Sequence, residues 1–188
     1  MFNRKEIFMS RILNKNIIFV GGIHGVGKTT LCNKIAKSFQ IEHYSSSELI
    51  YKLNSNKVKE NKRVSDAKEN QNILLEAVNK YLCNNKNYLL DGHFCLINDK
   101  GDLEEIPTNI FKTLKVKEII VLIDQPEEIF KKLISRDSRM YSLDFIKKFQ
   151  EREVSHGKYV AKQMNIDYKI INVSCYKNKI FKYFSNII

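Results

Sequence analysis

Short apolar segments alternate along this chain with longer segments of helical spacing. Segment 16–21 is apolar, rich in β-branched residues and ends in glycine, as expected of a buried strand. From Lys28 onward, Leu31, Ile35 and Phe39 recur at the three- to four-residue spacing of one helix face. This part of the chain therefore predicts a strand, a glycine-rich loop and a helix, in that order.

The alternation continues to the end of the chain. Capping residues and apolar stripes predict helices that begin near Ser47, Asp66, Pro126 and Ser142, with a last helix at the C-terminus. Strands that alternate with helices are typical of an α/β fold with a parallel sheet and right-handed crossovers. The further strands are expected at 43–45, 88–91, 118–123 and 168–172, with a hairpin turn at 99–102.

Length and composition favour a single globular domain. The 188 residues are 43% hydrophobic and 28% charged, with seven Gly and two Pro, which excludes disordered and collagen-like chains. The longest apolar runs are far shorter than the roughly 20 residues of a membrane-spanning helix. The four cysteines lie far apart without a C-x-x-C pattern, which fits a reducing compartment, so the cytoplasm is expected.

The formal net charge of +11 leaves two interpretations open. A basic surface can bind nucleic acid or other polyanions without specific contacts. The 26 lysines are scattered over every segment, however, and only six arginines are present, which favours a solvated lysine-rich surface. On the first interpretation, the stretch 52–63 is the one place where a local polyanion-binding patch would form.

Residues 22–29 read G-I-H-G-V-G-K-T and fit the phosphate-loop pattern G-x-x-x-x-G-K-[ST] between a predicted strand and a predicted helix. Glycines let the backbone wrap around phosphate oxygens, so that N–H groups and the helix N-terminus point at the anion. His24 either touches substrate or lies exposed at the loop tip. The expected nucleotide-binding residues are Gly22, His24, Gly25, Val26, Gly27, Lys28, Thr29 and Thr30, with Lys28 on the β- and γ-phosphates.

A carboxylate that positions Mg²⁺ is expected at the end of a neighbouring buried strand. Asp91 follows the apolar run at 88–90 and fits this place, so Thr29 and Asp91 are the predicted metal residues. Asp124 also ends a strand. The sequence after it reads as a helix start, so Asp124 is assigned mainly to structure.

Four blocks of sequence resemble the small adenylate kinase-like nucleoside monophosphate kinases, in particular the archaeal-type, ribosome-associated subgroup. The resemblance implies a three-layer P-loop NTPase fold, in which a five-stranded parallel sheet has helices on both faces, with a helical segment over the acceptor and a short lid. It also implies ATP as donor, Mg²⁺ as cofactor and a nucleoside monophosphate as acceptor. The blocks are GGIHGVGKTT at 21–30, LLDGHF at 89–94, IIVLIDQPEEIFKKL at 119–133, and the charged segment from Arg136.

The resemblance also assigns roles outside the loop. Asp91 and His93 match the subgroup's D-x-H motif, which places His93 near the transferred phosphoryl group; an ordinary strand-end histidine is the alternative. Arginine binds phosphate bidentately, so Arg136 and Arg139 are expected to close over that group. The expected acceptor-binding residues are Arg63, Gln71 and Arg152, the last on a polar stretch shared with His156 and Tyr159 that is expected to line the site.

The whole chain, 1–188, is thus expected to be one kinase domain. Its core comprises 16–45 and 83–188, its acceptor-covering segment 46–82 and its lid 136–142. The expected activity is Mg²⁺-ATP-dependent phosphoryl transfer to a nucleoside monophosphate, AMP first. The alternatives are a kinase for another small acceptor, an ATPase associated with RNA or ribonucleoprotein, and a nucleotide-binding module without turnover. Oligomeric state is not predicted.

Overall fold

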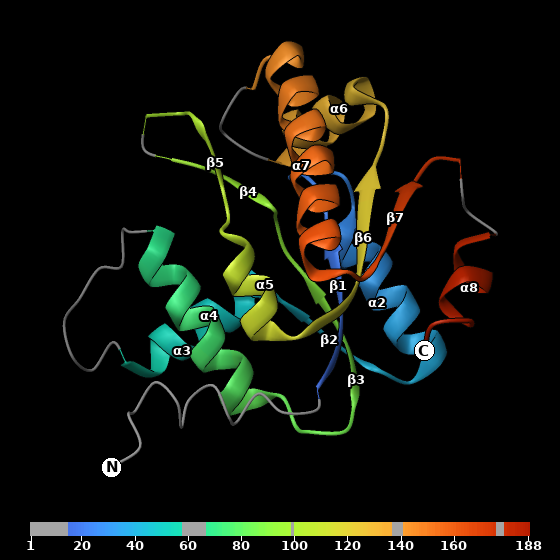
Figure 1. Cartoon of the computed structure of the whole chain (residues 1–188). Helices are drawn as coiled ribbons and strands as arrows, with labels where there is room; N and C mark the ends of the chain where they lie inside the picture. Colours follow the sequence, from blue (N-terminus) through green and yellow to red (C-terminus); the bar gives the residue numbers. More distant parts are fainter. Residues whose placement is uncertain (1–14, 58–66, 99, 137–140, 176–178) are drawn as a thin grey trace.

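The computed structural model describes residues 15–57, 67–98, 100–136, 141–175 and 179–188 (Figure 1). At its centre lies a parallel five-stranded sheet in the order β2-β3-β1-β6-β7. The three middle strands are almost wholly buried, which explains their unbroken apolar sequences. The strands are β1 (Asn16–Gly21), β2 (Glu42–Ser45), β3 (Asn87–Asp91), β6 (Val116–Ile123) and β7 (Asp167–Asn172).

The strand register brings three polar segments to one edge of the sheet. Val20, next to the end of β1, pairs with Asp91, the last residue of β3. Ser45, the last residue of β2, pairs with Asp91 as well. The carboxyl ends of parallel strands therefore meet where ligands bind in open α/β sheets.

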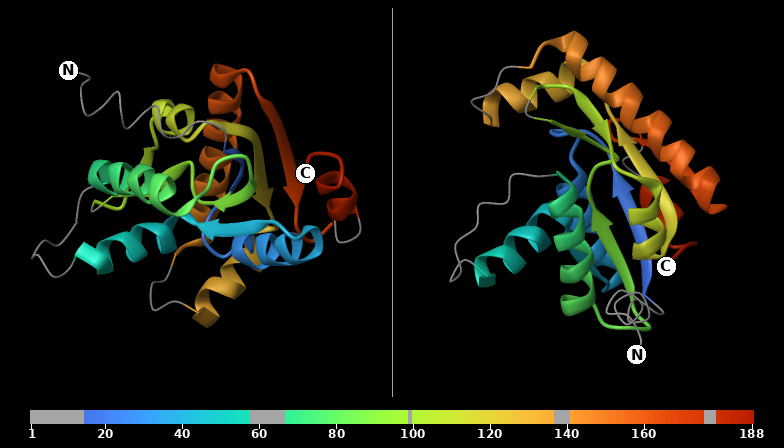
Figure 2. Two further views of the ribbon diagram at one scale, coloured as in Figure 1. Left: turned by 90° about the horizontal axis from the view of Figure 1, so that it is seen from below. Right: turned by 60° about the vertical axis from the view of Figure 1, so that its left-hand side comes forward.

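Helices cover both faces of the sheet and confirm the expected three-layer fold. Helices α5 (Thr108–Leu114) and α7 (Leu143–Met164) lie over one face, and α2 (Lys28–Phe39) lies over the other (Figure 2). Helix α7 is capped by Ser142, whose side chain accepts a hydrogen bond from the Phe145 N–H at 3.1 Å. Two further helices are α6 (Pro126–Arg136) and α8 (Lys179–Phe184).

A pair of helices extends from the β2 edge of the sheet. Helices α3 (Ser46–Lys57) and α4 (Ala67–Tyr81) pack against each other and form the region that was expected to cover the acceptor (Figure 1). Beyond β3, the predicted hairpin is present as β4 (Cys95–Ile97) and β5 (Leu103–Glu105). Gly101 in its turn has φ of 85°, a left-handed conformation that glycine adopts without strain.

Some boundaries differ from the predicted ones. Strand β6 begins at Val116, two residues before the predicted start at 118, and α3 begins at Ser46, one residue before the predicted start at Ser47. Helix α5 was not predicted from the sequence. It has only seven residues and its N-cap position, Pro107, offers no side-chain cap, so its local signal is weak. Its stability comes from burying its apolar side chains, which are Ile110, Phe111 and Leu114.

Within these described ranges, no helix combines the length and apolar character needed to cross a membrane. Most of the predicted lid at 136–142 falls outside them, as do Arg63 and Arg139. Arg136 is the last residue of α6.

Candidate active site

The phosphate loop joins β1 to α2 through glycines that no other residue could replace without strain. Gly22, Gly25 and Gly27 have φ of 141°, 79° and 102°. A Cβ atom on Gly22 would lie 2.7 Å from the carbonyl oxygen of Leu122, and one on Gly25 would lie 2.9 Å from Leu133 Cγ. Gly27 occupies the N-cap position of α2, so the loop ends where the positive end of the helix begins.

Lys28 points back into this loop. Its ammonium donates hydrogen bonds to the carbonyl oxygens of Gly22 at 2.6 Å and Ile23 at 3.1 Å. It also lies 3.2 Å from Nε2 of His93. Since an ammonium can only donate, Nε2 of His93 accepts, and the imidazole is neutral with its proton on Nδ1. The loop therefore holds the positively charged ammonium of Lys28 in place, where it can stabilise bound phosphate groups.

Thr29 and Asp91 form an oxygen-rich pair beside the loop. The Thr29 hydroxyl donates to Asp91 Oδ2 at 3.1 Å, and Asp91 is almost fully buried. A hydroxyl and a carboxylate so close together fit Mg²⁺, which prefers oxygen ligands and usually keeps several waters. Both residues were predicted for this role. When bound, Mg²⁺ would neutralise charge on the nucleotide phosphates.

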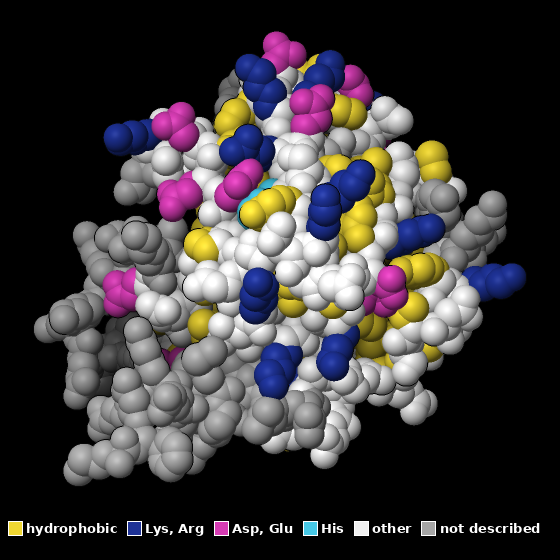
Figure 3. All heavy atoms as spheres, viewed as in Figure 1, with side chains coloured by type: hydrophobic (Ala, Val, Ile, Leu, Met, Phe, Trp, Pro, Cys, Tyr) yellow, Lys and Arg dark blue, Asp and Glu magenta, His cyan; other side chains and the backbone are white. Residues whose placement is uncertain are grey.

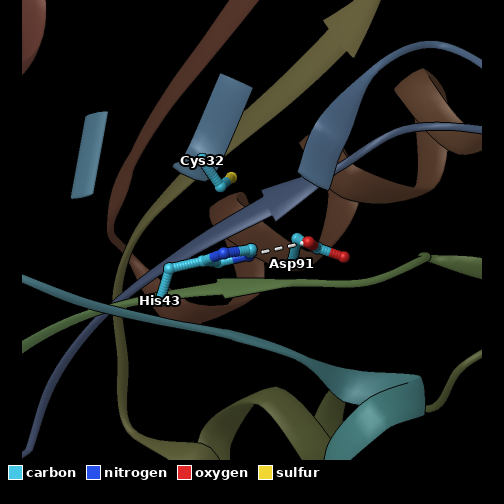
Figure 4. Close-up of side chains that lie close together, drawn as sticks. All are labelled: Cys32, His43 and Asp91. Carbon is cyan, nitrogen blue, oxygen red and sulfur yellow. Dashed lines mark hydrogen bonds and ion pairs between the residues drawn. The ribbon is translucent and has the colours of Figure 1, made fainter. Parts of the chain in front are cut away.

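A histidine that the sequence analysis missed orients Asp91. Nε2 of His43 lies 2.8 Å from Asp91 Oδ2, and Nδ1 lies 2.8 Å from Asn33 Oδ1. Figure 4 shows His43 and Asp91 directed toward each other, with Cys32 beside them. Burial raises the pKa of the Cys32 thiol, which therefore stays protonated at neutral pH. His43 was detectable only through the parallel register of β2 with β3.

His93 lies between the loop and α7. Its ring centroid is 4.2 Å from that of His24, and the ring stacks on Phe149 with an interplanar angle of 20°. Burial, followed by the charges of Lys28 and His24, holds the pKa of His93 well below its ordinary value. His93 is therefore a neutral hydrogen-bonding group next to Lys28.

A buried acid of α7, Glu153, holds two segments of the site together. Its carboxylate accepts hydrogen bonds from the N–H groups of Gly22 at 3.0 Å, Phe94 at 2.8 Å and Cys95 at 2.8 Å. Burial raises its pKa to about 7, against the opposing influence of these hydrogen bonds and of Lys28. Glu153 was not selected from the sequence, although it occupies the apolar stripe of α7 between Ile146 and Val160.

Asp124 has the structural role that the sequence indicated. Its carboxylate accepts hydrogen bonds from Lys132 Nζ at 2.8 Å, the Ser174 hydroxyl at 2.5 Å and the Gln125 N–H at 3.0 Å. The side-chain amide of Gln150 hydrogen-bonds both the N–H and the C=O of Asp124. These contacts join the end of β6 to α6, α7 and the segment after β7.

A cleft of about 1090 Å³ opens at this edge of the sheet. One part is lined by the loop from His24 to Thr30, with Lys34, Lys132 and Phe181. The other part is lined by residues of α3, α4, α5 and the β2 end. Its polar lining there consists of hydroxyls and amides, and among the described residues it includes no Lys or Arg: Ser45, Ser46, Ser47, Tyr51, Asn54, Asn70 and Gln71.

The structure brings together some of the predicted site residues but not all of them. Lys28, Thr29, Asp91, His93 and Gln71 all line the cleft, as do His24 and Thr30.

Arg152, the third residue predicted to bind the acceptor, does not line the cleft. Its Nε lies 2.7 Å from Glu105 Oε1 on the hairpin, and the side chain is 54% exposed. His156 also turns to the hairpin, where Nε2 contacts the carbonyl oxygen of Ile106 at 2.8 Å. The polar stretch of α7 contacts the phosphate loop through Glu153 instead.

Fold and site together define a P-loop protein of the kinase-like class, with a phosphate loop, an adjacent carboxylate and an open cleft. The chain belongs to the AAA domain family, whose model matches residues 21–150. Family, fold and loop agree with the expected ATP-dependent, kinase-like enzyme. They support a family of kinases for nucleoside monophosphates or other small molecules and do not distinguish the adenylate kinase subgroup.

Two solved structures illustrate the likeness. A gluconokinase from Sinorhizobium meliloti 1021 superposes with a TM-score of 0.54 at 12% sequence identity, over 92% of this chain and 90% of that one. A shikimate kinase from Bacteroides thetaiotaomicron has a TM-score of 0.52 at 13% identity, over 91% of this chain and 94% of that one. At such identities the likeness establishes the fold. Comparison with curated protein sequences gave no significant match.

Proposed function

We propose that the protein transfers the γ-phosphoryl group of Mg²⁺-ATP to a small-molecule acceptor. The observation that carries this proposal is the continuity of the cleft, which runs from Lys28 and Thr29 to the wall formed by α3 and α4. A plain ATPase needs only the first part. A transferase needs a second compartment in line with the γ-phosphate, so that the acceptor replaces water there.

The chain's own residues have distinct roles in this reaction. The N–H groups of the loop and the Lys28 ammonium bind the β- and γ-phosphates, while Thr29 and Asp91 would hold Mg²⁺. The bond from the γ-phosphorus to the bridging oxygen of ADP breaks, and a bond to an acceptor oxygen forms. Arg136 and Arg139 are proposed to neutralise charge on the moving group.

Within this proposal, a nucleoside monophosphate, AMP first, is the acceptor that the sequence resemblance favours. Gln71, a buried amide on the cleft wall, supports it because an amide suits hydrogen bonding to a base or sugar. An anionic phosphate acceptor would need no strong general base. Arg63 is the proposed partner of the acceptor phosphate.

A second candidate is a kinase for a hydroxylated small molecule. It is favoured by the acceptor wall itself, whose described polar residues are hydroxyls and amides. It also agrees with the two structural neighbours, which are named for gluconate and shikimate kinases.

The decisive experiment incubates the protein with Mg²⁺-ATP and a panel of nucleoside monophosphates, sugars and hydroxy acids. ³¹P NMR and mass spectrometry would follow ADP together with a phosphorylated product. We expect transfer to one acceptor class, AMP first: with AMP, two ADP form for each ATP consumed, and with any other acceptor one ADP forms for each phosphorylated product. If ADP were released at the same rate without any acceptor, the protein would be an ATPase rather than a transferase.

A further inference from the structure

Glu153 is a carboxylate placed where water does not reach it. The residue is 1% exposed and lies on the face of α7 that packs against the sheet. Burying a carboxylate is unfavourable unless hydrogen bonds replace those it made with water. Three backbone N–H groups do so here, and all three belong to segments that form the candidate active site.

The two carboxylate oxygens of Glu153 accept these three hydrogen bonds unequally. Oε1 accepts from both Gly22 and Phe94, and Oε2 accepts from Cys95. Gly22 is the first glycine of the phosphate loop, whereas Phe94 and Cys95 directly follow the segment with Asp91 and His93. A single oxygen atom therefore sets the separation between the phosphate-binding loop and the segment that carries Asp91.

Close packing around Phe94 prevents this arrangement from relaxing. A Cβ atom on Gly21 would lie 2.3 Å from the Phe94 ring, and one on Gly157 would lie 3.1 Å from it. The ring also contacts Phe19 and Phe111, with centroids 5.1 Å and 5.0 Å away. The side chain of Phe94 is thus fixed between β1 and α7, while its N–H is fixed by Glu153 one turn before Gly157.

We propose that Glu153 is a positioning residue for phosphoryl transfer, which aligns the phosphate loop with the Asp91–His93 segment by accepting hydrogen bonds from both. This inference rests on the proposed function for its kinetic consequences. It also makes a prediction about ATP binding that is independent of any acceptor.

The sign of the effect on ATP affinity distinguishes positioning from simple electrostatics. A negative charge beside a phosphate site repels ATP, so removal of the charge alone should tighten ATP binding. Loss of the hydrogen bonds that hold the loop should weaken it, because the N–H groups of the loop would no longer converge on the phosphates. Glu153→Gln removes the charge and one acceptor oxygen with little change in shape.

The test measures ATP dissociation constants by isothermal titration calorimetry and transfer kinetics, for the wild type, E153Q and E153D. E151Q is the matched control, since Glu151 is an exposed acid on the same helix. We expect E153Q to bind ATP about 10- to 100-fold more weakly, the usual cost of losing a group that orients ligating residues. E153D keeps the carboxylate with a shorter reach and should recover part of the loss, and E151Q should match the wild type.

The kinetic split adds a readout that a purely structural role would not change. In E153Q, kcat should fall and the KM for ATP should rise. The KM for the acceptor should change little, because Glu153 does not contact the acceptor wall. Circular dichroism and the melting temperature would establish that the variants are folded at the assay temperature. If E153Q does not fold, the ATP dissociation constant and kinetics of E153D provide the test instead.

Three results would overturn the proposal. They are a folded E153Q whose ATP affinity is unchanged or tighter, a folded E153D identical to the wild type when E153Q does not fold, and an E151Q effect equal to that of E153Q. A failure of the proposed function would give a different result, because the wild type would then phosphorylate no acceptor. The ATP affinities of the variants would still test the positioning role of Glu153.

Discussion

At the scale of single residues, the site depends on groups that hold one another in place. The Lys28 ammonium is directed by two carbonyl oxygens of its own loop and by neutral His93. Asp91 is directed by Thr29 and His43, and His43 in turn by Asn33. Such preorganisation lowers the reorganisation needed when charge develops in the transition state.

Lys28→Ala should abolish phosphoryl transfer without unfolding the protein. The side chain contacts loop carbonyls and His93, so its removal deletes charge stabilisation and leaves the apolar core intact. We expect a loss in kcat on the order of 100-fold or more. Steady-state assays of ADP formation would measure it, with Lys37→Ala, an exposed lysine of the same helix, as control. A folded K28A protein with the turnover of the wild type would exclude the loop from catalysis.

The sequence predicts residues whose chemistry follows from local spacing, and it misses those whose role depends on distant contacts. The loop glycines, Lys28 and Thr29 form one short motif, so they were all identified. His43 and Glu153 act through partners 48 and up to 131 positions away, which no local pattern reveals. The contact of Arg152 with the hairpin was not predicted either, because the helical pattern did not show which face of α7 meets the hairpin.

At the scale of elements, helices α3 and α4 supply the wall opposite the phosphate loop. Leu49 and Leu53 of α3 are buried together with Leu74 and Val78 of α4, so the two helices share one apolar contact surface. Polar residues on the cleft side, such as Gln71, are therefore held on a packed scaffold.

Gln71→Leu should raise the KM for the acceptor and leave the KM for ATP nearly unchanged. Leucine has a similar size, so α4 should keep its packing while losing the amide. Loss of one hydrogen bond to a charged or strongly polar acceptor corresponds to a change of about 10-fold. Initial rates with either substrate varied would separate the two constants, and Asn72→Ala, an exposed neighbour, serves as control. Equal shifts in both constants would place Gln71 outside the acceptor compartment.

Gly157→Ala should destabilise the protein although alanine normally favours helices. In an exposed helix the change would gain about 1 kcal/mol. Here the new methyl group would lie 2.9 Å from Val121 Cγ2 and 3.1 Å from the Phe94 ring, and both neighbours are fully buried. We expect the free energy of unfolding to fall by about 1–3 kcal/mol, as overpacked cores do.

Urea denaturation would measure the change caused by Gly157→Ala. Exposed Ser155→Ala on the same helix should stay within about 0.5 kcal/mol of the wild type. If G157A were as stable as the wild type or more so, the contact between α7 and Phe94 would be looser than the structure has it.

Elements with a strong local pattern were predicted well, whereas the short helix α5 was not. The start of α7 at its Ser142 cap was predicted as observed, since a long apolar stripe and a good cap reinforce each other. Helix α5 has seven residues and depends on tertiary burial, so its sequence alone did not reveal it.

At the scale of the whole molecule, the net charge of +11 is distributed rather than concentrated on the visible face. Lys and Arg side chains there are separated by neutral and apolar surface, with Asp and Glu among them at the top of the view (Figure 3). Scattered charges attract polyanions by counterion release without forming a shaped site.

Binding to unrelated RNA should accordingly be weak and strongly dependent on salt. Fluorescence anisotropy with a labelled RNA should show affinity that falls steeply toward physiological ionic strength. ATP hydrolysis without an acceptor should not respond to RNA. A dissociation constant below about 1 μM at physiological salt, or RNA-stimulated hydrolysis, would favour an RNA-associated ATPase over a small-molecule kinase.

The hydrogen bond between Gly22 and Glu153 has a consequence for folding during translation. The two residues are 131 positions apart, so the ribosome synthesises the phosphate loop long before it synthesises α7. A nascent chain that lacks α7 already contains β1, β3 and β6, yet nothing in it supplies the carboxylate that joins the loop to the segment after Asp91. We therefore expect the growing chain to become able to capture ATP late in translation, once α7 has emerged and docked.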